Sequence, residues 1–291
     1  MKHSFIVCQV EREGSDHSYT TLPPLQQEFA GRVLSAAKAR GIPVVMVLLN
    51  AGQIALDTLP SQPDALVEAF YPAFGAPALA KQLVGLSNRW GRLPYTQYDS
   101  AFADAIPLAD MNVSGAVGRT WRYYKGQPNY RFGDGLSYAN FTLACSGGPP
   151  SVPADGSLAV SINCSSSFAA ASAGVTDGDE ILLVTHRVGA DVVAAVNGRH
   201  PIPFGSLRAF ERIALVQGSG TVQTAFSFGA VDFALITETG AAVVYPGTHF
   251  LEVSPRPPGA PFSLHVVVTG GVPLVLSQPP PLPPTKQHAS A

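Results

Sequence analysis

The sequence predicts a partial α/β sandwich unit with a mostly parallel sheet, followed by an all-β sandwich. In residues 4–86, short apolar runs alternate with segments of helical periodicity, a pattern that is typical of βαβ units. From residue 157 onward, short apolar runs are separated by turn residues at intervals that predict an antiparallel β-sandwich. The length of 291 residues fits two domains of ordinary size.

The first strand and the first helix follow from apolar periodicity and from proline placement. Residues 4–10 form a short apolar run that predicts a buried strand, and residues 11–21 lack periodicity and predict a loop. Pro23 and Pro24 suit the first turn of a helix, because the missing proline N–H would have no partner there. Gly41 is the expected stop of this helix. The apolar residues that share one face of the helix are Leu25, Phe29, Val33 and Ala37.

Two more strands and a second helix are predicted in the first half. Residues 43–49 are almost entirely apolar and rich in β-branched side chains, which is typical of a strand covered on both faces. Residues 50–52 then form either a tight turn or one wall of a crevice at the carboxyl ends of the strands. Residues 65–70 predict a third strand, and residues 76–86 a helix. The residues expected to face inward from this helix are Leu79, Leu83 and Leu86.

The second half is predicted to consist of turns and short strands. Residues 91–141 are aromatic and rich in turn residues, and the small, Pro- and Gly-rich residues 145–156 predict a linker. The proline-rich end predicts a disordered or polyproline II tail. The predicted strands are residues 158–163, 180–188, 208–217, 223–228 and 249–253. The resulting domains are residues 1–144 and 157–275, with a tail of residues 276–291.

Composition and motifs exclude several function classes. The 18 basic and 20 acidic residues give a net charge of −2, which excludes a nucleic-acid binder that works by bulk charge. No apolar stretch reaches the roughly 18 residues of a membrane span, and the N-terminus shows no signal peptide. Metal-ligand spacings, phosphate-binding loops and dinucleotide motifs are missing, so we expect neither a metal nor a cofactor.

The cysteines and glycosylation motifs leave the compartment open. Cys145 and Cys164 either form a disulfide or remain free, because sequence alone fixes no connectivity. Three N-x-[ST] triplets begin at Asn112, Asn140 and Asn163. They fit a secreted, glycosylated protein, although such triplets also arise by chance.

Several motifs together resemble glycoside hydrolase family 3, and in particular its β-xylosidase branch. The stretches GRTWRYY (residues 118–124) and YRFGDGLSY (130–138) carry the resemblance most strongly. Further segments follow in the order of the family: EREGSD (11–16), EAFYP (68–72), GRLP (91–94), DGDE (177–180), FER (210–212) and YPGTH (245–249). The resemblance covers roughly residues 5–268. It implies the C-terminal α/β domain of the family, followed by a fibronectin type III-like (immunoglobulin-like) sandwich.

The resemblance implies a function and also a missing part. Members of the family that resemble xylan 1,4-β-xylosidase release terminal xylose or related pentoses from plant-wall oligosaccharides, outside the cell or in the cell wall. They begin with a barrel that carries the nucleophilic aspartate, and a barrel needs about 200 to 250 residues. We therefore expect this chain to lack the nucleophile and to be inactive alone. It would meet xylo-oligosaccharides only together with a barrel domain, which a separate chain can provide.

Two glutamates are the candidate catalytic residues. Retaining glycosidases use one nucleophilic carboxyl group and a second that serves as acid and then as base. By its place in the motif before Gly14, Glu13 is the first candidate for the acid/base, and Glu11 is the second. The competing interpretation is that both are solvated loop charges. His17 stands where the family usually has arginine, and Asp134 where it has an aromatic residue.

Two other interpretations of the chain remain. It is either a non-catalytic module that binds carbohydrate or a protein partner, or the product of an incomplete gene model. The aromatic residues of the two main motifs either stack on sugars or, as we favour, pack the turns at the end of the α/β domain. These aromatic residues are Trp121, Tyr123, Tyr124, Tyr130, Phe132 and Tyr138.

Overall fold

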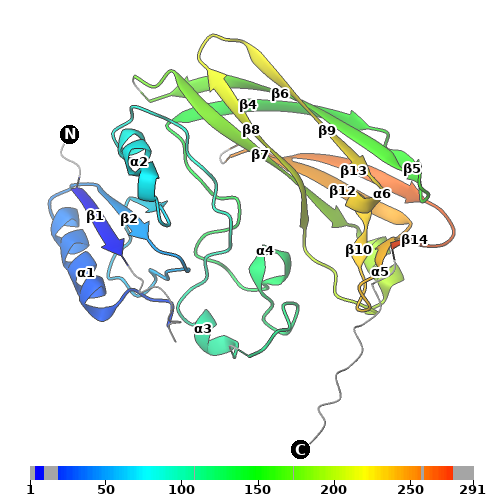
Figure 1. Cartoon of the computed structure of the whole chain (residues 1–291), viewed down its shortest axis with the longest axis horizontal. Coiled ribbons are helices and arrows are strands. Elements are labelled where there is room, and N and C mark those ends of the chain that lie inside the picture. The colour runs from blue at the N-terminus through cyan, green and yellow to red at the C-terminus, as the bar shows by residue number, and fades with distance from the viewer. Residues whose placement is uncertain (1–3, 10–18, 108, 173, 257–258, 278–291) are drawn as a thin grey trace, which may run out of the picture.

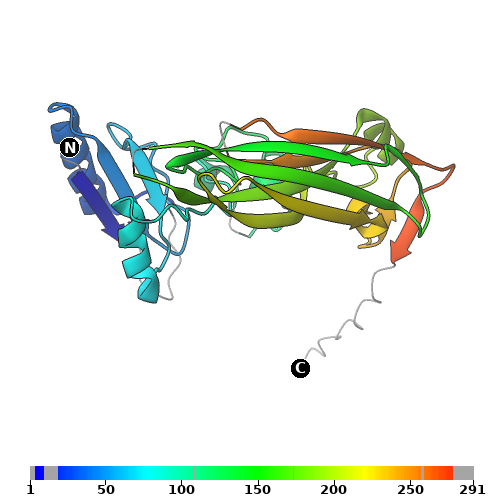
Figure 2. The ribbon, with the colours of Figure 1, turned by 90° about the horizontal axis from the view of Figure 1, so that it is seen from above.

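The computed structural model describes residues 4–9, 19–107, 109–172, 174–256 and 259–277. It consists of a small α/β part and an elongated part made of β-sheets (Figure 1). Viewed from above, the long strands of the β part lie in layers beside the α/β part (Figure 2). The candidate catalytic residues Glu11 and Glu13 lie outside the described residues.

The α/β part is built on a parallel sheet with the strand order β1-β2-β3. Its strands and helices agree with those predicted for residues 4–86, apart from their ends. They are β1 (Ser4–Gln9), α1 (Pro24–Lys38), β2 (Val44–Leu49), β3 (Ala65–Glu68), the 3-10 helix η1 (Ala73–Gly75) and α2 (Ala76–Leu83).

The face through which helix α1 contacts the sheet only partly overlaps the predicted face, because Val33 and Ala37 pack in the core as predicted but Leu25 and Phe29 do not. Leu25 is 82% exposed and Phe29 is 57% exposed, whereas Ala30 and Leu34 are buried. Gly31 lies so close to Pro60 that an added Cβ would be 3.1 Å from the proline Cγ. The prediction of Leu25 and Phe29 as part of the packed face is therefore wrong. Small residues that allow close approach carry little weight in a periodicity count, so part of the true contact face was overlooked.

Helix α2 is shorter than predicted, and it buries less of its surface. It ends at Leu83, and Gly85 follows with a φ of +78°, a conformation that favours glycine. Leu79 and Leu83 are half-buried, but Leu86 is 78% exposed. The inward orientation predicted for Leu86 is wrong because the helix ends before this residue.

Residues 91–138 form an irregular segment with two short helices. These are α3 (Phe102–Ala105) and α4 (Thr120–Tyr123). Gly118 precedes α4 with a φ of +74°, and an added Cβ would be 1.8 Å from the carbonyl oxygen of Tyr123. Only glycine therefore fits the first position of the GRTWRYY motif.

The β part consists of two larger sheets and one small sheet. The strand orders are β5-β13-β12-β7-β8, β4-β6-β9 and β10-β11-β14. All strand pairs are antiparallel except β5 with β13. The elements are β4 (Ala139–Gly148), β5 (Ser151–Pro153), β6 (Ala159–Ala171), β7 (Asp177–Val188), α5 (Ala190–Val196), β8 (Ser206–Val216), β9 (Thr221–Gly229), α6 (Ala230–Phe233), β10 (Leu235–Ile236), β11 (Ala242–Val244), β12 (Gly247–Ser254), β13 (Phe262–Thr269) and β14 (Leu274–Ser277).

One hydrophobic core lies between the two larger sheets. Side chains from both sheets meet in it, among them Ile162 of β6, Leu182 of β7 and Leu251 of β12, none of which is exposed. The five strands predicted in this half are confirmed as parts of β6, β7, β8, β9 and β12.

The predicted linker is wrong, because residues 145–156 belong largely to the sheets. Cys145 lies in β4 opposite Cys164 of β6, and the two form a disulfide. Small residues and glycines in this stretch concealed the strand pattern. At the other end, β14 includes residues 276 and 277, which were predicted as tail. Residues 278–291 of the predicted tail lie outside the described residues.

Candidate functional site

The carboxyl ends of the three parallel strands lie along one edge of the sheet. Gln9, the last residue of β1, pairs with Leu49 at the end of β2, and Leu48 pairs with Glu68 at the end of β3. The segment with the candidate residues Glu11 and Glu13 begins at this edge, directly after Gln9. In open α/β sheets, ligands bind outside the carboxyl ends of the strands, so this edge is the candidate site.

A polar cluster of three residues, the half-buried Glu68 and Tyr95 and the buried Asn50, lies at this edge. The Tyr95 hydroxyl donates a hydrogen bond to Oε1 of Glu68. Asn50 is fully buried, and its Nδ2 donates to the carbonyl oxygen of Gly52 at 2.6 Å. Burial raises the pKa of Glu68, and the hydrogen bond from Tyr95 opposes this shift. The cluster therefore provides a carboxyl group that binds its proton more tightly than a solvated glutamate does.

Sequence reasoning reached only part of this cluster. Asn50 was considered as a crevice residue, and Glu68 appeared only within the EAFYP motif. Glu68 is the last residue of β3, and Asn50 directly follows the neighbouring parallel strand β2. These positions at the strand ends would have indicated that the two side chains lie close together. Tyr95 is far along the chain, so only the folded structure brings it to Glu68.

The backbone after Glu68 adopts an unusual conformation. Phe70 has a φ of +51° and Ala73 a φ of +37°, values that are rare for residues other than glycine. The ring of Phe70 lies edge-on against that of Tyr95, with 6.1 Å between the ring centroids. This contact holds the turn against the polar cluster.

Two arginines, the half-buried Arg92 and the buried Arg256, join the α/β part to the β part. Nη1 of Arg92 donates to the carbonyl oxygens of Ile181 at 2.8 Å and Ser254 at 2.7 Å. Arg256 donates in the opposite direction, to the carbonyl oxygens of Gly91 at 2.8 Å and Trp90 at 2.9 Å. The GRLP motif is thus part of a structural joint.

The glycines of the YRFGDGLSY motif belong to the same joint. At Gly133 an added Cβ would be 2.9 Å from Leu183 Cδ1, and at Gly135 it would be 2.9 Å from Nη1 of Arg256. The carboxyl group of Asp134 accepts a hydrogen bond from the backbone N–H of Arg131 at 2.7 Å. Asp134 therefore stabilises the turn of the motif.

The aromatic residues of the motifs pack against one another and against neighbouring loops. Trp121 stacks on Phe132 with 4.6 Å between the ring centroids, and Tyr138 lies edge-on to Trp90 at 5.9 Å. Arg122 of the same segment donates to Ser206 Oγ at 3.3 Å, across to the β part. These contacts agree with the packing role that we favoured.

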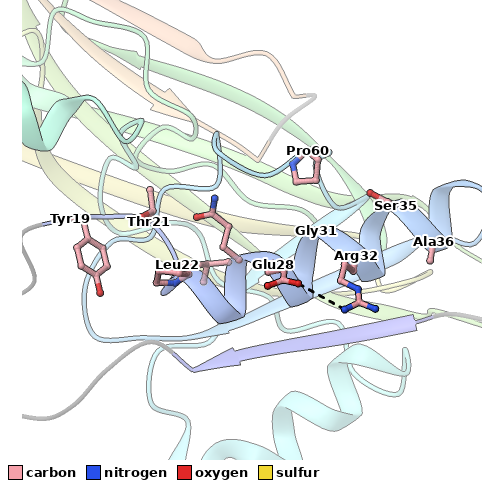
Figure 3. A pocket seen from close by; sticks show the side chains of 11 residues that line it. Tyr19, Thr21, Leu22, Glu28, Gly31, Arg32, Ser35, Ala36 and Pro60 are labelled. Carbon is pink, nitrogen blue, oxygen red and sulfur yellow. Dashed lines mark ion pairs between the residues drawn. The ribbon is translucent and has the colours of Figure 1, made fainter.

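An open groove of about 1080 Å³ lies elsewhere, along one side of α1 (Figure 3). Glu28 provides the one carboxyl group among its described lining residues, and this group pairs with Arg32 at 3.9 Å (Figure 3). Both side chains are highly exposed, at 67% and 81%. The described lining residues of the groove include neither the polar cluster at the edge of the sheet nor a second carboxyl group.

Across the part of the chain that the structure describes, no three or more His, Cys, Asp and Glu side chains gather in a group that could hold a metal ion. Among the same residues, none of the helices has the length and apolar character needed to cross a membrane.

The comparisons with known proteins identify relatives of both parts. The sequence model of the Glycosyl hydrolase family 3 C-terminal domain matches residues 4–138 and thus ends one residue before β4. Beta-xylosidase/alpha-L-arabinofuranosidase 2 of Medicago sativa subsp. varia is 32% identical over 45% of this chain and 18% of its own length. Beta-D-xylosidase 3 of Arabidopsis thaliana is 29% identical over 84% of this chain and 34% of its own length.

A solved structure shares the fold over most of the chain. The beta-glucosidase from Listeria innocua in complex with isofagomine superposes with a TM-score of 0.71 at 23% identity, covering 92% of this chain and 37% of that structure. Where the match extends over most of this chain, the chain spans about a third of the length of its relatives. Residues 4–138 of this chain therefore match the C-terminal domain of glycosyl hydrolase family 3, and relatives named beta-xylosidases are similar to the chain.

Proposed function

We propose that this chain is the C-terminal portion of a family 3 exo-β-glycosidase that releases terminal xylose, or a related pentose, from xylan or arabinan oligosaccharides. The match to the family 3 C-terminal domain supports the reaction class, and the relatives that are named beta-xylosidases support the sugar. The observation that carries the proposal is the aligned carboxyl edge of the sheet, where the segment with Glu11 and Glu13 begins.

The proposed chemistry uses two carboxyl groups from different parts of the enzyme. The nucleophilic aspartate would come from a barrel domain and form the covalent glycosyl intermediate. This chain would contribute the acid/base, with Glu13 as first candidate and Glu11 as second. The acid/base protonates the departing glycosidic oxygen and then takes a proton from the water that hydrolyses the intermediate. Because this aspartate would come from the barrel domain, we expect turnover only when that domain is present.

Complementation by a barrel domain tests this proposal. The chain is mixed with a separately expressed family 3 barrel domain, and hydrolysis of an aryl xyloside is followed. We expect turnover with the wild-type chain and a large loss with Glu13→Gln, while Glu28→Gln, a matched exposed glutamate on α1, retains full turnover. If Glu11→Gln loses turnover and Glu13→Gln retains it, the acid/base role is assigned to Glu11. Equal turnover with all variants would overturn the proposed role of both residues.

The proposal extends to the domain organisation and the location of the protein. We infer a fibronectin type III-like unit for the β part, supported by its two facing, mainly antiparallel sheets around one core. We place its start at Ala139, the first residue of β4, in place of residue 157. The disulfide between Cys145 and Cys164 supports an extracellular or cell-wall location, since disulfides persist in oxidising compartments.

The alternative function, a non-catalytic module that binds carbohydrate or protein, makes a different prediction. Trp90 and Trp121 are the two tryptophans of the chain, and both lie half-buried in the aromatic packing near the joint. Binding of xylo-oligosaccharides by the chain alone would change their fluorescence during a titration. The proposed exo-glycosidase role predicts that this change requires the barrel domain.

A further inference from the structure

Two of the three N-x-[ST] motifs lie on one exposed face of the sheet β4-β6-β9, which runs along the upper edge of the molecule in Figure 1. Asn140 and Thr142 belong to the first motif in β4, and Asn163 and Ser165 to the second in β6. Because side chains alternate along a strand, the asparagine and the hydroxyl residue two positions later share a face. Asn140, Asn163 and Thr142 are exposed, and Ser165 is half-buried.

The residues around both asparagines leave room for a bulky group. Asn163 pairs with Ser146 of β4 on one side and with Ala225 of β9 on the other, and Asn140 pairs with Ala170. The outward positions of the three strands carry neither aromatic nor long aliphatic side chains. They are Asn140, Thr142, Ala144 and Ser146 of β4, Ser161, Asn163, Ser165 and Ser167 of β6, and Thr221, Gln223, Ala225 and Ser227 of β9.

This sheet also lacks the charges that usually keep an exposed sheet soluble. None of the residues of β4, β6 and β9 is charged, although β4 and β9 form the edges of the sheet. Exposed edges pair with other chains unless charge, proline or a cover prevents it. A hydrated group attached to this face would provide such a cover.

The disulfide in the same sheet indicates the cellular compartment in which the chain folds. Cys145 and Cys164 form their disulfide between β4 and β6, and Cys164 is the middle residue of the second motif. Disulfides of this kind form in the secretory pathway, the compartment in which N-x-[ST] motifs are modified.

We propose that Asn140 and Asn163 carry N-linked glycans that cover this face of the β part. In the transfer, Nδ2 of each asparagine forms a bond to C1 of an oligosaccharide held on a lipid diphosphate. The bond between C1 and the diphosphate oxygen breaks, the lipid diphosphate leaves with the electron pair, and one amide proton is released. The transfer precedes sheet formation, because in the folded sheet the Ser165 hydroxyl already donates to Oε1 of Gln223 at 2.9 Å. This inference shares the secretory route with the proposed function, but it does not depend on catalytic activity.

Site-resolved glycan mapping tests the proposal. The full chain is secreted from yeast behind a cleavable signal peptide, with Asn112→Gln in the background so that every glycan reports on this face. The protein is treated with peptide N-glycosidase, and the conversion of asparagine to aspartate is located by mass spectrometry. We expect conversion at Asn140 and Asn163 and a two-step decrease in apparent mass.

Matched variants separate modification from folding. Thr142→Ala and Ser165→Ala each remove one motif and are expected to remove one glycan, whereas Thr142→Ser and Ser165→Thr keep both. Both substituted positions, Thr142 and Ser165, lie on the outward face of the sheet, and intact disulfide formation reports the fold. A secreted, disulfide-bonded chain that is unmodified at Asn140 or Asn163 overturns the assignment of that position. A chain that is unmodified at both and dimerises through this face would assign the face to a second copy.

Discussion

Glu68 has a half-buried side-chain carboxyl group at the edge of the sheet where the parallel strands end. The structure describes the surroundings of this group. Desolvation raises its pKa, while the hydrogen bond from Tyr95 lowers it, and desolvation is the larger effect. In turn, burial and the carboxyl group of Glu68 raise the pKa of Tyr95. Both groups therefore hold their protons more tightly than solvated side chains of the same kind do.

Removal of the tyrosine hydroxyl tests this balance. Tyr95→Phe is expected to raise the pKa of Glu68 further, because the hydrogen bond that stabilises its ionised form is lost while the burial remains. The carboxyl ¹³C chemical shift of Glu68, followed through a pH titration, measures the effect. Tyr98→Phe serves as the control, since the Tyr98 hydroxyl accepts from the N–H of Thr120 and has no contact with Glu68. An unchanged or lower pKa in Tyr95→Phe would contradict the prediction.

Two buried histidines form a second proton-linked pair, in the core of the β part. His186 Nε2 lies 2.8 Å from His249 Nδ1, and His249 Nε2 lies 2.8 Å from the carbonyl oxygen of Tyr245. The carbonyl can only accept, so His249 carries its proton on Nε2, and its Nδ1 accepts the proton of His186 Nε2. Phe233 lies against both rings. Both histidines are therefore held neutral.

This pair is expected to make the fold sensitive to acid. Burial lowers the pKa of both histidines below their ordinary value of 6.5. The nearby His249 and Arg208 lower the pKa of His186 further. At His249, the carbonyl group of Tyr245 and the charge of Asp191 partly oppose the decrease. Below pH 6.5 the unfolded chain binds protons that the native state does not, so the free energy of unfolding decreases as the pH falls. The slope is about 1.4 kcal/mol per pH unit for each histidine.

Urea unfolding between pH 8 and pH 5 measures this slope. Glu68 and Glu180 act in the opposite direction, because their raised pKa values let the native state bind protons first. The comparison of the wild-type chain with His186→Gln isolates the histidine contribution, and a smaller slope is expected in the variant. His265→Gln, at an exposed position of β13, should keep the wild-type slope. Equal slopes in all three proteins would refute the prediction.

At the scale of elements, helix α1 shows how much the choice of face matters. Leu34 is 3% exposed and packs into the core beneath the sheet, whereas Leu25 on the predicted face projects into solvent. The helix is the same in both interpretations, and only its rotation about its axis differs. The energetic consequences of substitution therefore differ strongly between the two leucines.

Paired alanine substitutions measure this difference. Leu34→Ala is expected to lower the free energy of unfolding by about 2 to 5 kcal/mol, because it removes buried methylene groups and leaves a cavity. Leu25→Ala should change it by less than about 0.5 kcal/mol, as is usual at the surface. Denaturant unfolding with matched slopes gives both values. A larger cost for Leu25→Ala than for Leu34→Ala would contradict the observed orientation of α1.

At the scale of the whole molecule, the joint between the two parts depends on buried charge. The side chain of Arg256 is 3% exposed, and so is that of Glu180, whose Oε1 accepts from the backbone N–H of Arg256 at 3.2 Å. Arg256 also hydrogen-bonds carbonyl groups of the α/β part. A buried arginine with these partners ties the end of β12 to the GRLP segment.

Substitution of Arg256 is expected to weaken the joint. Arg256→Ala leaves the carboxyl group of Glu180 buried without its partner and should cost about 3 to 5 kcal/mol of unfolding free energy. Arg187→Ala breaks the more exposed pair with Glu252, joined at 2.8 Å, and should cost less than about 1 kcal/mol. Limited proteolysis between the two parts, together with denaturant unfolding, detects the loosened joint. Equal costs for the two variants would show that Arg256 adds nothing specific to the joint.

The sequence by itself determined many of the local elements of this protein, although β4, β13 and the short strands and helices of the second half were not predicted. The alternation of apolar runs and helical periodicity predicted β1, α1, β2, β3 and α2 in order, and the apolar runs of the second half predicted five strands. Gly118, Gly133 and Gly135 belong to the motifs that carry the family resemblance, so the sequence already marked them. The steric reason for each glycine is seen only in the folded structure. Such features depend on neighbouring residues, whose preferences a sequence contains directly.

Only the tertiary structure decided which residues meet. It rotated α1 so that Leu34 faces the sheet, paired the supposed linker around Cys145 with β6, and brought Tyr95 to Glu68. It also placed Arg256 against Gly91, 165 positions away along the chain. The physical reason is that periodicity fixes which residues share a face but not what covers that face. Burial, pKa shifts and long-range hydrogen bonds depend on residues that are distant in the sequence, and a local sequence pattern does not identify them.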